Sequence, residues 1–313
     1  MEHELSKKAI LFEPWNLGDV MIALAIGLQA PSRLSIACSS RWHELIGSVI
    51  DGMVAPKIIT ADLGYVTRNK NKSFRFKNLP TISTDDTVLS IRGDARDYYA
   101  AKTMFPNSKI VVRGWLPFIA KRVSVFDLPF ANGWLPIRNC YRAWASLANV
   151  EWLAVERFYG EKRPIQEDPL VVIHVGAQWR SRQYPHVAQL LDLLKVSYRV
   201  QIVAGPGDPV PCDVDERDVL RLVNGELADM FRSSSYVITN DSGPMHLAAL
   251  LRCRMMVVTR QAAIREWLPP TAVAIEARDS PKGYRSAPLS DSIASGWPAP
   301  HEVLEKFNKY ANR

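Results

Sequence analysis

The chain has 313 residues, a length that favours two domains over one core, because a domain usually holds roughly 100–200 residues. Hydrophobic residues make up 47% and charged residues 23%, which excludes disordered, collagen-like and coiled-coil chains. Lysine plus arginine (39) exceeds aspartate plus glutamate (32), and the resulting net charge of +7 suits an anionic partner such as a nucleotide or an acidic membrane face.

Several classes of protein find no support in the sequence. The four cysteines are widely spaced without a CxxC pair, so we expect neither a disulfide framework nor a zinc site. Zinc-finger, RNP and helix-turn-helix patterns are absent, and nucleic acid is not an expected partner. No apolar run approaches the ~20 residues that span a bilayer. The N-terminus lacks the order of a signal peptide, so we expect a cytoplasmic protein.

The first half of the chain alternates short apolar runs with helical patterns. We expect strands at 9–12, 33–38, 87–91 and 109–112, and helices at 19–29, 42–50, 94–104, 115–125 and 139–149. The polar stretch 67–84 predicts a long loop. Strands that alternate with helices favour a parallel sheet.

A polar segment with two prolines, 161–169, predicts an interdomain linker, after which the same alternation restarts. We expect further strands at 170–174, 199–204, 236–239, 255–259 and 273–275, and helices at 185–195, 227–233, 243–251 and 301–310. The prediction is an α/β chain with an N-terminal domain over 1–160 and a C-terminal domain over 161–313. The helix 301–310 fits against either domain.

Loops at the carboxyl ends of the expected strands carry groups suited to a ligand. Asp19 is either a catalytic carboxylate or a helix residue favoured by the macrodipole. Arg180 and Arg182 either grip phosphate oxygens or lie in a solvated loop. Asp208 either binds ribose hydroxyls or makes a turn.

The segment 240–249, Asn-Asp-Ser-Gly-Pro-Met-His-Leu-Ala-Ala, is the most informative part of the chain. Asp241 or Ser242 can cap the helix that follows, and Gly243 lets backbone approach a ligand closely. Free N–H groups at a helix N-terminus bind anions such as a diphosphate. This local chemistry fits an anion site and a well-capped helix equally.

Taken together, these motifs resemble the heptosyltransferases of glycosyltransferase family 9, which use ADP-heptose in lipopolysaccharide core assembly. Leu17-Gly18-Asp19-Val20 is similar to that family's GDV segment, and Asp241 to Ala249 to its D-[ST]-G-x-x-H-L-A-A pattern. His174 to Ala177, followed by Arg182 to Pro185, resembles its H-x-G-A and K-x-W-P stretch. The motifs stand in the family's order.

The resemblance implies the GT-B architecture, two Rossmann-like domains with parallel sheets facing a central cleft. It implies inverting transfer without a metal or other cofactor, with Asp19 as general base and Arg182 stabilising the leaving diphosphate. Asn16 and Gly18 would lie on the acceptor side. The expected nucleotide-sugar residues are Gly176, Arg180, Asp208, Asp241, Ser242, Gly243, Met245 and His246. The partners would be the donor and a glycan or lipid-linked glycan, with peripheral contact at the cytoplasmic face of the inner membrane.

Departures from the family pattern leave alternatives open. Arg182 and Tyr184 replace a lysine and a tryptophan of the family, and Arg252 and Arg254 stand where it usually has glycine and proline; we expect these changes to affect the donor side. Arg260 stands where the family has glycine at the end of the next strand. Glu13 stands where members often carry arginine. A non-catalytic nucleotide-sugar or glycan-binding protein and another GT-B enzyme, such as a nucleotide-sugar epimerase, remain alternatives. The tryptophans at 15, 115 and 134 either line an acceptor groove or pack in the core.

Overall fold

The computed structural model describes residues 8–63, 79–91, 95–112, 139–177, 182–260, 267–276 and 296–312. The chain divides into two compact units, Met1–Val155 and Glu156–Arg313. The expected boundary at residue 160 stands at the end of helix α6 (Trp152–Gly160), whereas the division falls within that helix. The expected helix 115–125 and most of the expected loop 67–84 lie outside the described residues.

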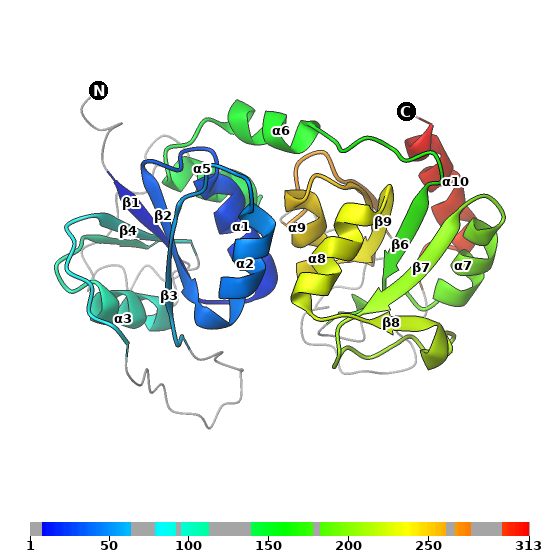
Figure 1. Cartoon of the computed structure of the whole chain (residues 1–313), viewed down its shortest axis with the longest axis horizontal. Coiled ribbons are helices and arrows are strands. Elements are labelled where there is room, and N and C mark those ends of the chain that lie inside the picture. Colours follow the sequence, from blue (N-terminus) through cyan, green and yellow to red (C-terminus); the bar gives the residue numbers. More distant parts are fainter. Residues whose placement is uncertain are drawn as a thin grey trace. The chain divides into compact units, whose positions relative to one another are not determined.

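The first unit holds a five-stranded parallel sheet in the order β3-β2-β1-β4-β5 (Figure 1). Its strands are β1 (Ala9–Glu13), β2 (Leu34–Ser39), β3 (Lys57–Ala61), β4 (Thr87–Ser90) and β5 (Ile110–Val112). Its helices are α1 (Leu17–Gly27), α2 (His43–Ile50), α3 (Ala95–Met104) and α5 (Cys140–Leu147), with a 3-10 turn at Ser40–Trp42. Strand β3 was not predicted, because its side chains are only partly buried and it lacks a fully apolar run.

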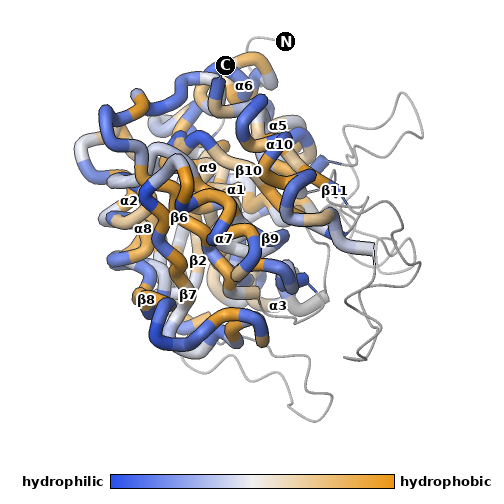
Figure 2. The backbone as a smooth tube through the Cα atoms, turned by 90° about the vertical axis from the view of Figure 1, so that its right-hand side faces the viewer, coloured by the Kyte–Doolittle hydropathy of each residue, from blue (hydrophilic) through white to orange (hydrophobic). Residues whose placement is uncertain are grey.

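Burial explains why the first unit folds this way. Every residue of β1 is buried, as expected for a central parallel strand covered on both faces. Helix α1 is also buried nearly all round, because it packs against β1, β2 and α5. On the other face, Phe12 and Phe105 meet edge to face within a cluster that includes α3. Figure 2 colours the described backbone by hydropathy and shows hydrophobic stretches alternating with hydrophilic ones along the chain.

The second unit holds a six-stranded parallel sheet in the order β11-β10-β9-β6-β7-β8. Its strands are β6 (Leu170–His174), β7 (Arg199–Ala204), β8 (Val219–Arg221), β9 (Tyr236–Asn240), β10 (Arg254–Thr259) and β11 (Val273–Glu276). Its helices are α7 (Val187–Lys195), α8 (Asn224–Ser233), α9 (Gly243–Leu250) and α10 (Pro300–Ala311), with a 3-10 turn at Glu216–Asp218. The predicted class, α/β with two parallel sheets, is confirmed. Strand β8 and helix α6 were not predicted.

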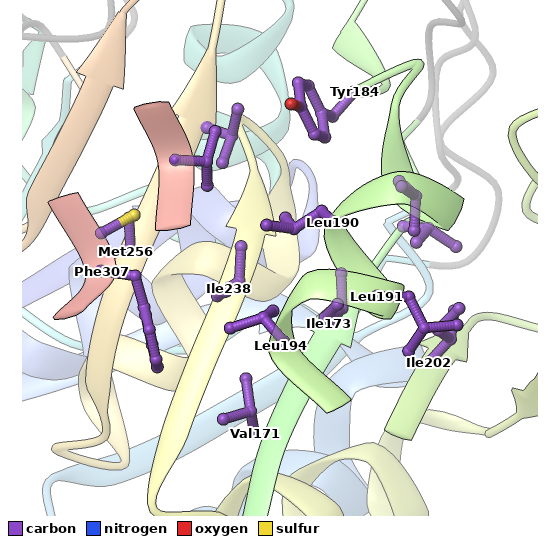
Figure 3. Close-up of a cluster of buried hydrophobic side chains, with 14 of the residues drawn as sticks. Val171, Ile173, Tyr184, Leu190, Leu191, Leu194, Ile202, Ile238, Met256 and Phe307 are labelled. Atoms are coloured by element: carbon purple, nitrogen blue, oxygen red, sulfur yellow. The ribbon is translucent and has the colours of Figure 1, made fainter. Parts of the chain in front are cut away.

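The core of the second unit lies between the sheet and helices α7 and α10. Figure 3 shows Leu190 and Leu194 of α7 facing Ile173 of β6 and Ile238 of β9, with Phe307 of α10 beside them. Helix α10 packs on α7 and β11, so it belongs to this unit. Helices α8 and α9 cover the opposite face (Figure 1).

The segment 161–169, predicted as a linker, forms hydrogen bonds to the second unit. The Arg163 backbone N–H donates to the Arg252 carbonyl at 3.2 Å, and the Gln166 N–H donates to Ser235 Oγ at 3.2 Å. These bonds make the segment part of that unit. The linker prediction failed because polarity and prolines do not reveal such pairing.

Candidate functional site

Each sheet has a point where the strand order reverses, between β1 and β4 in the first unit and between β6 and β9 in the second. In open α/β sheets ligands bind at such points, beyond the carboxyl ends of the strands. In the second unit Asn240 joins the two strand ends, because its Nδ2 donates to the Val175 carbonyl at 3.0 Å while its Oδ1 accepts from the Tyr184 N–H at 3.1 Å. The loop after β6 is thereby held over the end of β9.

Two of the predicted nucleotide-sugar residues, Gly176 and Asp208, lie against each other. Asp208 Oδ2 accepts the Gly205 N–H at 3.0 Å, which turns the carboxylate toward Gly176. A Cβ built on Gly176 would lie 1.9 Å from Asp208 Oδ2 and 2.6 Å from its Cγ. Glycine is therefore required at 176 by the close approach of the carboxylate.

His174, at the end of β6, is a buried imidazole beside Asp208, and it was predicted only as part of a motif. Its Nε2 lies 3.9 Å from Asp208 Oδ2, and neither ring nitrogen has a hydrogen-bond partner within the described chain. Burial lowers its pKa to about 4, although the Asp208 carboxylate opposes that shift. The imidazole is therefore neutral at pH 7.

The start of α9 presents uncapped backbone at the same edge of the sheet. Ser242 occupies the N-cap position in an extended conformation, and its side chain makes no capping hydrogen bond. The Ser242 cap that the sequence allowed is therefore not formed. Pro244 has no N–H and the Met245 N–H donates to the Ser242 carbonyl at 3.1 Å, so the Gly243 N–H is the first-turn group offered to an anion. Gly243 and Pro244 open the helix, while Met245 is fully buried and His246 is 5% exposed.

Arg182 reaches the same place from the loop after β6. Its Nη1 donates to the Asp241 carbonyl at 3.3 Å and lies 3.6 Å from Asp241 Oδ2. The structure thus brings Arg182 and Asp241 together beside the start of α9. Arg180 lies outside the described residues.

In the first unit the predicted residues Asn16, Gly18 and Asp19 gather at the start of α1. Asn16 is the N-cap, without a side-chain capping bond, and Gly18 is buried. Asp19 is partly exposed in the first turn of the helix. This position agrees with both sequence interpretations, since the macrodipole stabilises a carboxylate there and partial exposure leaves it reachable by a substrate.

The loop before α1 is anchored by residues that the sequence did not single out. The Trp15 indole Nε1 donates to both oxygens of Asp97 on α3, at 2.8 and 3.0 Å. The Trp15 carbonyl accepts from Arg41 Nη2 at 2.9 Å and from Trp42 Nε1 at 3.2 Å. Trp15 is buried, which agrees with the core interpretation of this tryptophan; positions 115 and 134 lie outside the described residues.

Glu13 ends β1 as a buried acid, 1% exposed. Its Oε1 accepts the Trp15 N–H at 3.4 Å. Burial, together with the Glu13 charge, raises the pKa of the neighbouring Cys38 thiol to about 12. The first unit therefore carries a buried acid beside the anchored loop.

The described residues show neither a metal site nor a membrane-spanning helix. They contain no group of three or more His, Cys, Asp or Glu placed to hold a metal ion. Within the same ranges, every helix is too short or too polar to cross a membrane.

Comparison with known proteins relates this geometry to solved structures. No family model matches the chain. No curated protein sequence matches it. The glycosyl transferase family 9 structure from Veillonella parvula is 15% identical, with a TM-score of 0.63, over 97% of each chain. The E. coli heptosyltransferase WaaC with ADP is 13% identical, with a TM-score of 0.63, over 97% of this chain and 99% of that one.

A third structure, E. coli ADP-heptose lps heptosyltransferase II, is 15% identical with a TM-score of 0.60, over 97% of this chain and 98% of that one. At such identities the likeness concerns the backbone, and it extends over nearly the whole chain. The chain therefore has the fold of the solved glycosyltransferase family 9 heptosyltransferases, as the resemblance of its motifs predicted.

Proposed function

We propose that this protein is an inverting glycosyltransferase that needs no metal ion and moves a sugar from a nucleotide donor to a glycan acceptor. One observation carries the proposal: Arg182 lies beside the uncapped start of α9, at the edge where Asp208 closes over Gly176. A cation and the positive end of a helix dipole suit a diphosphate, and a carboxylate suits ribose hydroxyls. Heptose from ADP-heptose is the favoured donor, because the solved structures of this fold include heptosyltransferases with ADP.

In the proposed reaction, an acceptor hydroxyl attacks the anomeric carbon while the bond from that carbon to the diphosphate oxygen breaks. Asp19 takes the hydroxyl proton as general base. Arg182 and the Gly243 N–H at the start of α9 stabilise the negative charge that develops on the leaving nucleoside diphosphate. Gly176, Arg180, Asp208, Asp241, Ser242, Gly243, Met245 and His246 form the donor site, with Asn16 and Gly18 beside the acceptor.

The same proposal covers the partners. The acceptor is a glycan or lipid-linked glycan such as lipopolysaccharide core. The net charge of +7 favours attraction to an acidic membrane face. We place the protein in the cytoplasm with peripheral contact at the inner membrane.

The first experiment compares thermal stabilisation by ADP, UDP, GDP and CDP. A ligand at about 100 times its dissociation constant adds about 2.7 kcal/mol to the free energy of unfolding. Selective stabilisation by ADP supports the ADP-linked donor. Preference for another nucleotide changes the sugar donor, and the absence of any response contradicts the proposed donor site.

The second experiment tests the catalytic step by following nucleotide release with glycan acceptors. Asp19→Asn should abolish transfer and leave nucleotide binding unchanged, whereas Asp51→Asn, an exposed site after α2, should preserve both. Undiminished turnover in Asp19→Asn contradicts its role as base. Binding without turnover across a broad acceptor panel favours the binding-protein alternative, and conversion of donor without acceptor favours an epimerase.

A further inference from the structure

The three arginines that interrupt the family pattern fall at opposite ends of one strand. Arg252 precedes β10 with a φ of 59°, and its Nη1 lies 3.2 Å from Glu161 Oε2. Arg254 begins β10. Both therefore stand at the amino end of the strand, away from the edge that carries Asp208 and the start of α9, contrary to the expectation that they affect the donor side. Arg260 follows Thr259 at the carboxyl end.

Arg260 is a largely buried cation with no counter-ion among the described residues. The residue is 8% exposed, and its Nε atom is buried with no hydrogen-bond partner within the described chain. Two other described arginines at this edge are paired: Arg182 with Asp241, and Arg221 with Glu216. An ion pair for Arg260 is absent among the described residues. Burying an uncompensated charge is costly, so such a group points to an anion that arrives from outside the chain.

The topology places Arg260 beside the proposed diphosphate site. Strand β10 pairs with β9 in parallel, with Val258 opposite Asn240. Two residues further on, the chain reaches Arg260 on one strand and Ser242, the N-cap of α9, on the other. Adjacent strands lie roughly 4.8 Å apart, so the Arg260 backbone stands within the length of an arginine side chain of the start of α9.

We propose that Arg260 is a second cationic ligand of the donor diphosphate. This inference rests on the proposed function and adds a residue to its site. The charge of Arg182 is offset by Asp241 at 3.6 Å, so a diphosphate bound at α9 requires further positive charge. Arg260 supplies it and forms charge-assisted hydrogen bonds to the phosphate oxygens.

The test measures dissociation constants by titration calorimetry for ADP, AMP and inorganic pyrophosphate. Arg260→Gln should weaken ADP and pyrophosphate by about ten- to a hundredfold, the usual effect of losing a hydrogen bond to a charged group, and should weaken AMP less. Arg260→Lys retains the charge without the guanidinium fork and should recover part of the loss. If the glutamine variant does not fold, the affinities of Arg260→Lys still test the proposal.

Arg254→Gln is the matched control, because its Nε is also buried without a partner, at the opposite end of the same strand. This variant should bind all three ligands as the natural chain does. A second readout separates binding from structural support: the ligand-free Arg260→Gln variant should melt at or above the natural temperature, since it loses an uncompensated buried charge.

Three results of these measurements would overturn the role proposed for Arg260. If the natural chain binds ADP and Arg260→Gln binds it within twofold, the inference is overturned and the proposed function stands. Equal weakening of AMP and ADP together with a lower melting temperature also overturns it, because that pattern marks a structural residue. If the natural chain binds neither pyrophosphate nor any of the four nucleoside diphosphates, the proposed function and this inference fail together.

Discussion

Gly176→Ala is the sharpest perturbation of the nucleotide edge, because the new methyl group has no room. Its Cβ would lie 1.9 Å from Asp208 Oδ2, 2.6 Å from Cγ and 2.9 Å from Cβ. Distances below 3.0 Å require movement, and the atoms that clash belong to the Asp208 side chain, whose Oδ2 also accepts the Gly205 N–H at 3.0 Å. The carboxylate must therefore leave its place.

The cost has two parts. Overpacking a tight site costs roughly 1–3 kcal/mol, and loss of the hydrogen bond to the partly exposed carboxylate costs about 1 kcal/mol more. The sum, about 3 kcal/mol, lowers the melting temperature of a unit of this size by about 6–12 °C. Nucleotide binding should weaken as well, because Asp208 no longer faces the ribose.

Calorimetric melting and ADP titration measure both effects, and the second unit offers a matched control. Gly207→Ala places its Cβ in open space and should leave both quantities unchanged. Adding Asp208→Gly to Gly176→Ala removes the clashing side chain and should restore most of the lost stability without restoring ADP affinity. Equal melting temperatures for Gly176→Ala and Gly207→Ala refute the described approach of Asp208 to residue 176.

Three further predictions follow from buried groups. Asp97→Ala leaves the buried Trp15 indole N–H without its acceptor, so chemical denaturation should show a loss of about 2 kcal/mol, and a change below 0.5 kcal/mol contradicts the anchoring bond. Burial holds the pKa of His174 at about 4 in the folded chain, against an ordinary 6.5, so its stabilising contribution is present above pH 6.5 and is lost as the pH falls through 4. In urea denaturation at several pH values, the free energy of unfolding of His174→Phe should therefore depend less steeply on pH than that of the natural chain. An unchanged dependence argues against a neutral buried imidazole. Cys38, with a pKa raised to about 12, should resist iodoacetamide at pH 8 while the exposed Cys212 is labelled, and mass spectrometry that finds both labelled equally contradicts the burial of Cys38.

The sequence predicted the central strands and most of the described helices, α6 excepted, because their apolar patterns leave few alternatives. Strands such as β1 and β6 are continuous apolar runs, and parallel sheets bury both faces of such strands. The short strand β8 and the partly exposed β3 lacked that pattern and became strands only by pairing with neighbours. Pairing partners distant in the chain leave no local signal.

The candidate site divides in the same way. Residue types and spacing identified Asp19, Gly176 and the segment that opens α9, since glycine, carboxylates and helix starts at strand ends are local features. The residues that hold these groups in place could not be predicted from the sequence. Asp97 meets Trp15 from a position 82 residues away, and no local pattern announces that contact.

By itself the sequence determined the α/β class, the order of the elements and the motifs at the strand ends, because periodicity and turn chemistry act over a few residues. Only the tertiary structure decided which charges are compensated. It paired Arg182 with Asp241, Arg221 with Glu216 and Arg252 with Glu161, and it buried Arg260 without an ionic partner among the described residues. The free energy of a charged side chain depends on its burial and on its ion-pair partners, and both are set by groups that the fold brings together from distant parts of the chain.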